Sequence, residues 1–297
     1  MNPFVSICCI TYNHEKYIRD AIEGFLNQKT NFPFEVLIHD DASTDGTANI
    51  IREYEAKYPQ IIKPIYQTEN QYSKGIDVSI FNYSRAKGKY IALCEGDDYW
   101  TDPYKLQKQV DFLEKNPDFG LVYTKCKLFN NNKVIGGRLK KDELFYNNKI
   151  PALTCVFKTD LIWDYLNIFF IKGTKWKMGD YPLWLWFYVN SKIGFVDKVT
   201  ATYRVLPESA SHFTDGNKRV LFNINSFEIA NFFAIDYFNI KDYNLFLNRN
   251  LFVLALSCLK HKSYLLSEVL KRIRSLSTKR WYNKILLLIL KNVKISK

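Results

Sequence analysis

Short apolar runs alternate with amphipathic segments through the first hundred residues, and this alternation constrains the fold more than any other feature of the chain. Each run is continuously apolar, as in strands that are buried on both faces of a parallel sheet. The segments between them repeat apolar residues at helical spacing. The expected strands are residues 4–10, 34–40, 61–67 and 89–96, and the expected helices are 15–28, a stretch from Ser43, Thr44 or Asp45 to Pro59, and 76–88. This order predicts an α/β fold with a doubly wound, mostly parallel sheet flanked by helices.

The rest of the chain continues this alternation less regularly. We expect a helix at 102–117, a strand at 119–129, a strand within 150–160, a buried helix at 179–192, strands in 193–205 and helices after Asn217. The change of pattern predicts two domains, residues 1–217 with the sheet and residues 218–297 as a helical C-terminal region.

The positive charge of the chain is concentrated in that C-terminal region. The formal net charge is +12, and residues 217–297 contain 15 Lys or Arg against four acidic residues. Surplus lysines on a solvated helical face would explain this asymmetry, and so would attraction to an anionic surface. No module that combines a basic patch with stacking aromatics is recognisable, so nucleic acid is not an expected partner.

The six cysteines form no C-x-x-C motif, and Cys8 and Cys9 are adjacent within an apolar run. This pattern indicates neither a zinc site nor a disulfide framework and fits a reducing cytoplasm. The N-terminus lacks the features of a signal peptide. The longest apolar stretches, 182–189 and 285–290, are shorter than the ~20 residues that cross a bilayer. We therefore expect a cytoplasmic protein.

Polar residues follow three of the expected strands at the point where each strand ends. They are Thr11-Tyr12-Asn13, Asp40-Asp41 and the segment Glu95 to Asp98. Ligands of open α/β sheets bind outside the carboxyl ends of the strands, so these groups should converge on one crevice. Carboxylates packed together there repel one another unless a cation offsets them. Hard oxygen ligands suit Mg²⁺ or Mn²⁺, and an acidic loop without a ligand is the alternative.

At this point the sequence resembles the family-two inverting glycosyltransferases with the GT-A fold, over roughly residues 3–215. The resemblance rests on four segments in the family's order and spacing. They are VSICCITYNHEKYIRDAIEGFLNQ, VLIHDDASTDGT, NYSRAKGKYIALCEGDDYWTDPYKLQKQ and GDYPLW. It implies transfer of a sugar from a nucleotide-diphosphate sugar to an acceptor hydroxyl, with residues 1–217 as the catalytic domain. The pathway implied is the synthesis of a surface polysaccharide or a lipid-linked glycan.

The resemblance also implies roles for residues of the nucleotide pocket. Thr11, Tyr12 and Asn13 would line it. Asp41 would accept a hydrogen bond from the N3–H of a pyrimidine, which favours a UDP or dTDP donor. The family often has Arg where this chain has Phe81, and Lys74 and Arg204 are candidate replacements for that Arg.

The acidic cluster resembles the family's D-x-D element, although Glu95 stands where the family often has Asp. Asp97 would lie near the sugar or ribose, and Asp98 would bind Mn²⁺ or Mg²⁺. Asp180 matches the family's general base. His212 falls where some members place a further metal or diphosphate contact.

Each of these residues also has a structural interpretation. Asp41 could cap the helix that starts near Thr44, Asp180 could cap the helix that follows it, and His212 could be an ordinary histidine. Trp100, beside the acidic cluster, could stack on a sugar ring or be a core residue. Two other functions remain open, a sugar-phosphate nucleotidyltransferase and a catalytically silent sugar-nucleotide-binding protein. A dinucleotide-dependent oxidoreductase is disfavoured because no G-x-G-x-x-G follows the first strand.

The C-terminal tail suggests a further partner. Residues 260–297 contain eleven Lys or Arg and one acidic residue, Glu268, around the apolar run 285–290. Such a segment can lie in the interface of an anionic membrane. The chain would then be peripheral on the inner face of the cytoplasmic membrane, where a lipid-linked acceptor is at hand. The alternative is a last helix that packs on the domain.

Overall fold

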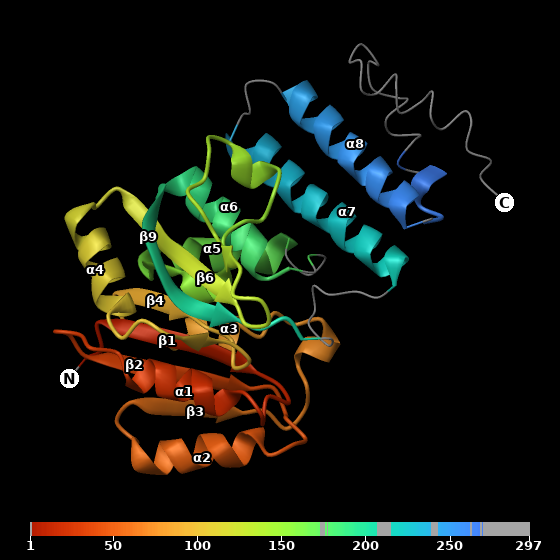
Figure 1. Ribbon diagram of the computed structural model, residues 1–297. Coiled ribbons are helices and arrows are strands. Elements are labelled where there is room, and N and C mark those ends of the chain that lie inside the picture. Colours follow the sequence, from red (N-terminus) through yellow and green to blue (C-terminus); the bar gives the residue numbers. More distant parts are fainter. Residues whose placement is uncertain are drawn as a thin grey trace. The chain divides into compact units, whose positions relative to one another are not determined.

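The computed structural model describes residues 2–172, 176, 178–206, 215–238, 243–261, 263–267 and 269 (Figure 1). The chain divides into two compact units. One is Met1–Lys141 with Asn148–Val205, and the other is Asp142–Asn147 with Leu206–Lys297. The first unit contains the sheet and the second contains long helices.

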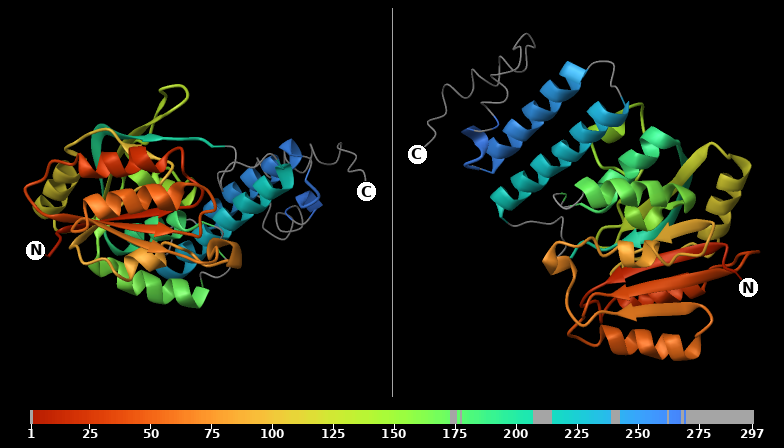
Figure 2. Two further views of the ribbon diagram at one scale, coloured as in Figure 1. Left: turned by 90° about the horizontal axis from the view of Figure 1, so that it is seen from below. Right: turned by 180° about the vertical axis from the view of Figure 1, so that it is seen from behind.

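The first unit alternates strands and helices as the sequence predicts. Its order is β1 (Val5–Thr11), α1 (Ile18–Leu26), β2 (Phe34–Asp40), α2 (Thr47–Lys57), β3 (Ile62–Tyr66), η1 (Tyr72–Lys74), α3 (Ile80–Tyr83), β4 (Tyr90–Leu93), β5 (Tyr99–Trp100), α4 (Lys105–Lys115), β6 (Phe119–Leu128), β7 (Val134–Ile135), η3 (Ala152–Thr154), β8 (Val156–Lys158), α5 (Asp160–Lys172), α6 (Asp180–Asn190) and β9 (Lys192–Tyr203). Helices lie on both faces of the sheet, with α1 and α2 together on one of them (Figure 2).

In the described residues the strands form one nine-stranded sheet of order β3-β2-β1-β4-β8-β6-β9-β5, with β7 paired to β6. The pairs β1/β2, β1/β4, β2/β3 and β6/β9 are parallel, whereas β8 runs antiparallel to β4 and β6, and β5 and β7 also pair antiparallel. The predicted doubly wound α/β fold is confirmed, and the sheet is mixed. The chain runs outward from β1 to β3 and then adds β4 on the other side of β1. The switch point therefore lies between β1 and β4, where open α/β sheets bind ligands.

The continuous apolar character of β1 matches its central position. Val5, Ile7 and Cys9 are fully buried on one face, and Ser6 and Cys8 are buried on the other. A strand covered on both faces has no solvated side, so alternation of polar and apolar residues is not required. At the sheet edge, β3 tolerates Pro64 because one side of an edge strand needs no hydrogen-bond donors.

The expected helix 76–88 is much shorter in the structure, where α3 is four residues long. Two tertiary contacts take its backbone donors. The N–H of Lys87 donates to Glu35 Oε1 at 3.0 Å, and the N–H of Gly88 donates to Ser6 Oγ at 2.9 Å. Both acceptors lie on neighbouring strands, so the segment leaves the helix before β4. The helix α5 was not predicted at all.

The second unit contains η2 (Glu143–Phe145), α7 (Gly216–Phe233), the π-helical turn η5 (Ala234–Phe238) and α8 (Tyr243–Lys260). Asp215 caps α7 by accepting the N–H of Asn217 at 2.7 Å. Phe246 packs against Phe145 and Phe227, each with ring centroids 6.3 Å apart. The early segment 142–147 is therefore joined to this unit by aromatic contacts.

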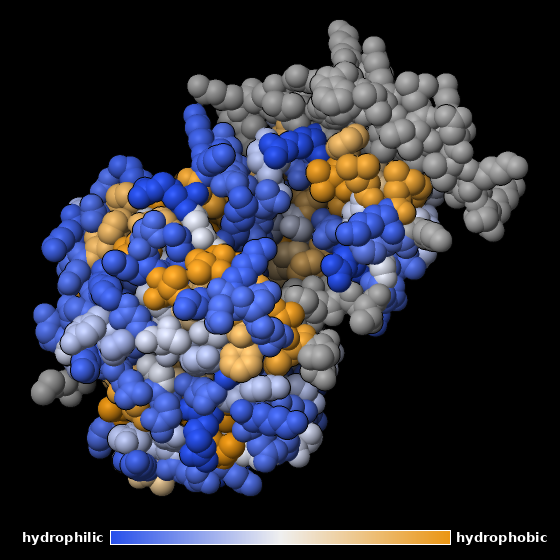
Figure 3. Space-filling view, viewed as in Figure 1, coloured by the Kyte–Doolittle hydropathy of each residue, from blue (hydrophilic) through white to orange (hydrophobic). Residues whose placement is uncertain are grey.

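Apolar side chains are exposed on α8, and Figure 3 shows them on the surface of the second unit. Val253 and Leu256 are 56% and 43% exposed. Among the described residues, no helix is both long enough and apolar enough to cross a membrane. Most of the basic tail, including the run 285–290, lies outside the described residues.

Candidate functional site

The loops that follow β1, β2 and β4 are joined by main-chain hydrogen bonds at the switch point. The N–H of Asp41 donates to the Thr11 oxygen at 3.0 Å, and the N–H of Gly96 donates to the Ile10 oxygen at 2.9 Å. A Cβ at Gly96 would lie 2.6 Å from Thr11 Oγ1, so only glycine allows this approach. The three polar groups therefore meet at one end of the sheet.

The loop after β1 presents the predicted residues in different ways. Thr11 is 3% exposed and Tyr12 is 44% exposed. Asn13 has a φ of 55°, a left-handed conformation that Asn tolerates better than most residues. Its N–H donates to Ser43 Oγ at 2.9 Å, and its Oδ1 accepts the N–H of Thr44 at 2.8 Å. Asn13 thus ties this loop to the loop after β2.

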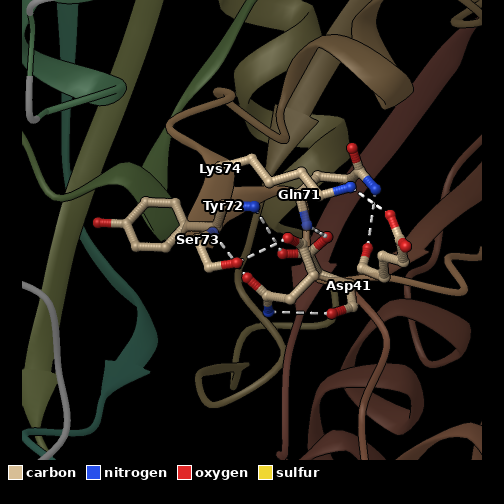
Figure 4. A network of polar contacts seen from close by, with 7 residues as sticks. Asp41, Gln71, Tyr72, Ser73 and Lys74 are labelled. Carbon is tan, nitrogen blue, oxygen red and sulfur yellow. Dashed lines mark hydrogen bonds and ion pairs between the residues drawn. The ribbon is translucent and has the colours of Figure 1, made fainter.

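Asp41 uses both carboxylate oxygens to hold the turn that begins η1 (Figure 4). Oδ1 accepts the N–H of Gln71 at 2.8 Å, and Oδ2 accepts the N–H of Tyr72 at 3.0 Å. The carboxylate does not cap α2, because the N–H of Thr47 is instead accepted by Asp45 Oδ1 at 3.0 Å. The interpretation of Asp41 as the cap of α2 is therefore wrong, although its side chain does stabilise the turn at η1.

Lys74 belongs to the same turn and forms an ion pair with Glu69 (Figure 4). Its side chain is half exposed, with 49% of its surface accessible. Exposed pairs of this kind hold their side chains weakly.

Asp97 and Asp98 follow β4 and are both largely buried, with 9% and 2% exposure. Asp98 Oδ1 accepts the main-chain N–H of Arg204 at 2.7 Å. Asp97 Oδ1 is buried and has no hydrogen-bond partner among the described residues. Burial and the charge of Asp97 raise the pKa of Asp98 well above its usual value. A buried acceptor without a donor is costly unless a ligand supplies the missing contact.

Arg204 contacts protein groups around this acidic loop. Its guanidinium donates from Nη1 to the main-chain oxygen of Asp97 at 2.8 Å and from Nη2 to Asp20 Oδ2 at 2.5 Å. Trp100, which follows the loop, is 4% exposed and donates from Nε1 to the Leu153 oxygen. Trp100 is therefore a core residue and not a stacking surface for a sugar.

Glu95 and Asp180 come from distant parts of the chain and share one electrostatic environment. Burial, followed by the charges of Asp97, Asp180 and Asp77, raises the pKa of Glu95 to about 8. The Glu95 side chain is accessible to solvent, so the surrounding protein crowds it without covering it. Glu95 is therefore an accessible carboxylate whose surroundings disfavour its charged form.

Asp180 is the first residue of α6, and the N-cap position belongs to Gly179. No side-chain cap hydrogen bond is present there. Instead, Asp180 Oδ2 accepts a hydrogen bond from Asn148 Nδ2 at 3.1 Å. Burial raises the pKa of Asp180, and the Asn148 hydrogen bond lowers it in part. The geometry therefore leaves Asp180 as a partly accessible carboxylate near Glu95.

Two further residues of this region were missed from the sequence. Asp77 accepts the N–H of Ser79 at 3.0 Å, and a Cβ at Gly179 would lie 2.9 Å from Asp77 Oδ2. Asn148 contacts Asp180. Neither lies in a recognisable motif, so only the fold could reveal them. Phe81, at the position where the family often has Arg, stacks on His39 with ring centroids 4.8 Å apart.

In the part of the chain that the structure describes, no group of three His, Cys, Asp or Glu is already arranged around a metal position. The residues nevertheless fit a hard divalent cation, because Asp97 Oδ1 is a buried oxygen without a donor and Asp98 lies beside it. Mg²⁺ and Mn²⁺ commonly take few protein ligands and fill the rest with phosphate and water. His212 lies outside the described residues.

The sequence model of "Glycosyl transferase family 2" matches residues 6–167. The chain belongs to glycosyl transferase family 2. EpsE of Bacillus subtilis, assigned as a glycosyltransferase, is 32% identical over 218 residues, which cover 70% of this chain and 74% of EpsE. The uncharacterised protein Rv1520 of Mycobacterium tuberculosis is 53% identical over 115 residues, which cover 38% of this chain and 32% of that protein. The match to the mycobacterial relatives thus spans about a third of their length.

Solved structures agree with the fold of family 2. TarS 1–349 of S. aureus in complex with UDP-GlcNAc has a TM-score of 0.57 at 19% identity, covering 85% of this chain and 81% of TarS. The mannosyltransferase PcManGT of Pyrobaculum calidifontis, in complex with GDP-Man and Mn²⁺, has a TM-score of 0.56 at 16% identity and covers 100% and 89%. The GT-A type fold expected from the sequence is confirmed.

Proposed function

We propose that this chain is a metal-dependent inverting glycosyltransferase that moves a sugar from a nucleotide-diphosphate sugar to an acceptor hydroxyl. One observation carries the proposal. Asp180, from α6, lies within electrostatic range of Glu95 at the carboxyl end of the switch-point strands. This proximity supports a site in which the acidic loop would serve the donor and Asp180 would serve the acceptor.

The donor would bind over the loops after β1 and β2. Thr11, Tyr12 and Asn13 would line the nucleotide pocket, and Lys74 is free to exchange its exposed partner Glu69 for a phosphate. Asp41 would accept the N3–H of a pyrimidine, because each of its oxygens has one backbone donor and retains a second lone pair. This favours UDP or dTDP. TarS was solved with UDP-GlcNAc and PcManGT with GDP-Man, so the family fold accommodates both nucleotide classes.

Asp97 and Asp98 would hold a divalent cation, Mn²⁺ or Mg²⁺. Mn²⁺ is present in the PcManGT complex. When bound, such an ion neutralises the negative charge that the departing diphosphate gains. The protein residues keep two carboxylates together in a buried loop, which an offsetting cation would stabilise. His212 is a further candidate contact for the metal or the diphosphate.

Asp180 would accept the proton of the acceptor hydroxyl as it attacks the anomeric carbon. Burial raises the pKa of Asp180, so its carboxylate is a stronger base than that of a solvated aspartate. Direct attack from the face opposite the leaving group inverts the anomeric configuration. No covalent intermediate is required.

The acceptor would be a growing glycan or a lipid-linked saccharide. TuaG of Bacillus subtilis, named for teichuronic acid biosynthesis, is 38% identical over 112 residues. This relative supports a role in polysaccharide synthesis. The domain that binds donor would be residues 1–217, and the basic region 218–297 would hold the protein at the inner face of the cytoplasmic membrane.

The test is release of nucleotide from a panel of UDP-, dTDP- and GDP-sugars, with and without Mn²⁺, in the presence of lipid-linked acceptors. We expect release that needs both Mn²⁺ and an acceptor, and that Asp98→Asn abolishes. Equal release by Asp98→Asn would contradict the metal assignment. Donor binding without any transfer would favour the silent binding protein.

The Asp41 assignment has its own test. Calorimetric titration with Mn²⁺ present should give tighter binding of UDP than of GDP, and Asp41→Ala should reduce that preference. Tighter binding of GDP by the wild-type chain would overturn the pyrimidine assignment.

A further inference from the structure

Arg204 directly follows β9 beside the acidic loop, and only 6% of its surface is exposed. Its guanidinium is held by two different parts of the first unit. Nη1 donates to the Asp97 main-chain oxygen at 2.8 Å, and Nη2 donates to Asp20 on α1 at 2.5 Å. The side chain therefore bridges α1 and the loop after β4.

Three aromatic rings surround the same guanidinium. Its Cζ lies 4.5 Å from the centre of the Tyr99 ring, and 5.2 Å from those of Tyr17 and Phe129. Cation–π contacts are attractive, and they strengthen where the cation is withdrawn from water. Together with the two hydrogen bonds, they fix the plane and the position of the group.

The main chain of β9 holds the acidic loop from the same side. The Arg204 N–H donates to Asp98 Oδ1 at 2.7 Å. Tyr99 and Trp100, the next residues after the loop, pair with Thr202 and Ala201. The side chain and main chain of Arg204, together with the end of β9, thus act on the same short segment.

We propose that Arg204 is a positioning residue that holds Asp97 and Asp98 in the arrangement that receives the divalent cation, and that its guanidinium does not contact the nucleotide. This inference rests on the proposed metal-dependent function. The positioning role follows from two contacts that one residue makes with the loop. Arg204 donates hydrogen bonds both to the main-chain oxygen of Asp97 and to the carboxylate of Asp98.

Lysine cannot reproduce this arrangement. It keeps the positive charge but lacks the planar fork that donates in two directions and stacks on rings. Loss of groups that orient a metal ligand typically costs 10–100-fold in metal affinity. Arg204→Lys therefore separates the positioning role from the charge.

The experiment uses the full chain and two titrations by calorimetry. Mn²⁺ is titrated with UDP saturating, and UDP is titrated in EDTA without metal. We expect Arg204→Lys and Arg204→Met to weaken Mn²⁺ binding about 10–100-fold and to leave metal-free UDP binding within about twofold of wild type. Asp20→Asn, at a half-exposed position that does not threaten the fold, should give a smaller loss of Mn²⁺ affinity.

Arg19→Lys is the matched control, because Arg19 lies next to Asp20 on α1 and pairs with Glu53 at the surface. Melting temperature and circular dichroism establish that each variant is folded. Unchanged Mn²⁺ affinity in Arg204→Lys and Asp20→Asn would overturn the positioning role. Loss of metal-free UDP affinity with normal Mn²⁺ binding would make Arg204 a nucleotide ligand instead. If the wild-type chain itself does not bind Mn²⁺, the proposed metal site fails, and this role fails with it.

Discussion

At the scale of single residues, Lys105 is a fully buried cation whose Nζ lies 4.2 Å from the centre of the Trp100 ring. The Nζ has no hydrogen-bond partner among the described residues. Burial lowers the pKa of Lys105 to about 8 from 10.5. The stacking on Trp100 therefore offsets only part of the cost of removing the charge from water.

Lys105 predicts a pH-dependent stability with a definite sign. Between pH 8 and 10.5 the unfolded chain binds more protons at this position than the folded chain, so its contribution to the free energy of unfolding rises with pH. Lys105→Met lacks this rise. We expect the variant to be the more stable protein at pH 7, with the difference shrinking by about 3 kcal/mol toward pH 10.5.

Urea denaturation of both proteins across this pH range measures the effect. The buried thiols other than Cys94 and Cys155, which interact electrostatically with Lys105, titrate alike in both proteins and cancel in the difference. Lys115→Met, an exposed position on the same helix, is the control. A difference between wild type and Lys105→Met that does not change with pH would contradict the assignment.

The residues of the site differ in how far the sequence alone could place them. Asp97, Asp98 and Asp180 lie in motifs that resemble those of the family. In the structure, Asp97 and Asp180 both lie within electrostatic range of Glu95. For Arg204 the sequence offers only a candidate replacement for a nucleotide-binding arginine, since it cannot show that Asp20 and three rings surround the guanidinium. Asn148 could not be predicted, since its role depends on a single contact with Asp180.

At the scale of elements, α1 packs unusually closely on β5, and Gly24 makes this possible. A Cβ at Gly24 would lie 3.0 Å from both the main-chain nitrogen and oxygen of Trp100. Asp20 lies one turn earlier on the same face of α1, so this close approach also brings Asp20 to Arg204. The glycine is thus needed for packing rather than for backbone conformation.

Gly24→Ala should therefore destabilise the protein despite the higher helix propensity of alanine. The propensity gain is about 1 kcal/mol, whereas overpacking against rigid backbone costs about 1–3 kcal/mol. We expect a net loss of about 1 kcal/mol in the free energy of unfolding, together with weaker Mn²⁺ binding. Gly137→Ala is the control, because nothing lies within 4 Å of the added Cβ. A Gly24→Ala protein more stable than wild type would contradict this packing.

The strength of the local sequence pattern decides which helices and strands the sequence predicts. Strands β1 and β2 and helix α1 carry strong periodic or continuous apolar patterns and were predicted. β5 is two residues long and exists because it pairs with β9, a tertiary contact with no local signal. The expected helix 76–88 does not reach its predicted end, because the N–H groups of Lys87 and Gly88 donate to the side chains of Glu35 and Ser6.

At the scale of the whole molecule, the C-terminal tail predicts binding to anionic membranes. Near such a surface each Lys or Arg contributes about 1 kcal/mol, and salt screens the attraction. We expect the full chain to sediment with anionic liposomes at low salt and to be released at high salt. Replacing Lys271, Arg272, Arg274, Lys279 and Arg280 by Gln should reduce that binding strongly. Equal sedimentation with neutral liposomes, or no effect of these substitutions, would refute the membrane contact.

One site in the first unit is proposed both to bind the donor and to deprotonate the acceptor, and Asp180→Asn tests this proposal most directly. The measurement is the donor dissociation constant and the transfer rate in the same protein preparation, with melting temperature as the control for folding. We predict near-normal donor and Mn²⁺ binding with transfer reduced by at least about 10²–10⁴-fold, because asparagine cannot accept the proton. Transfer at the wild-type rate by a folded Asp180→Asn protein would contradict the account.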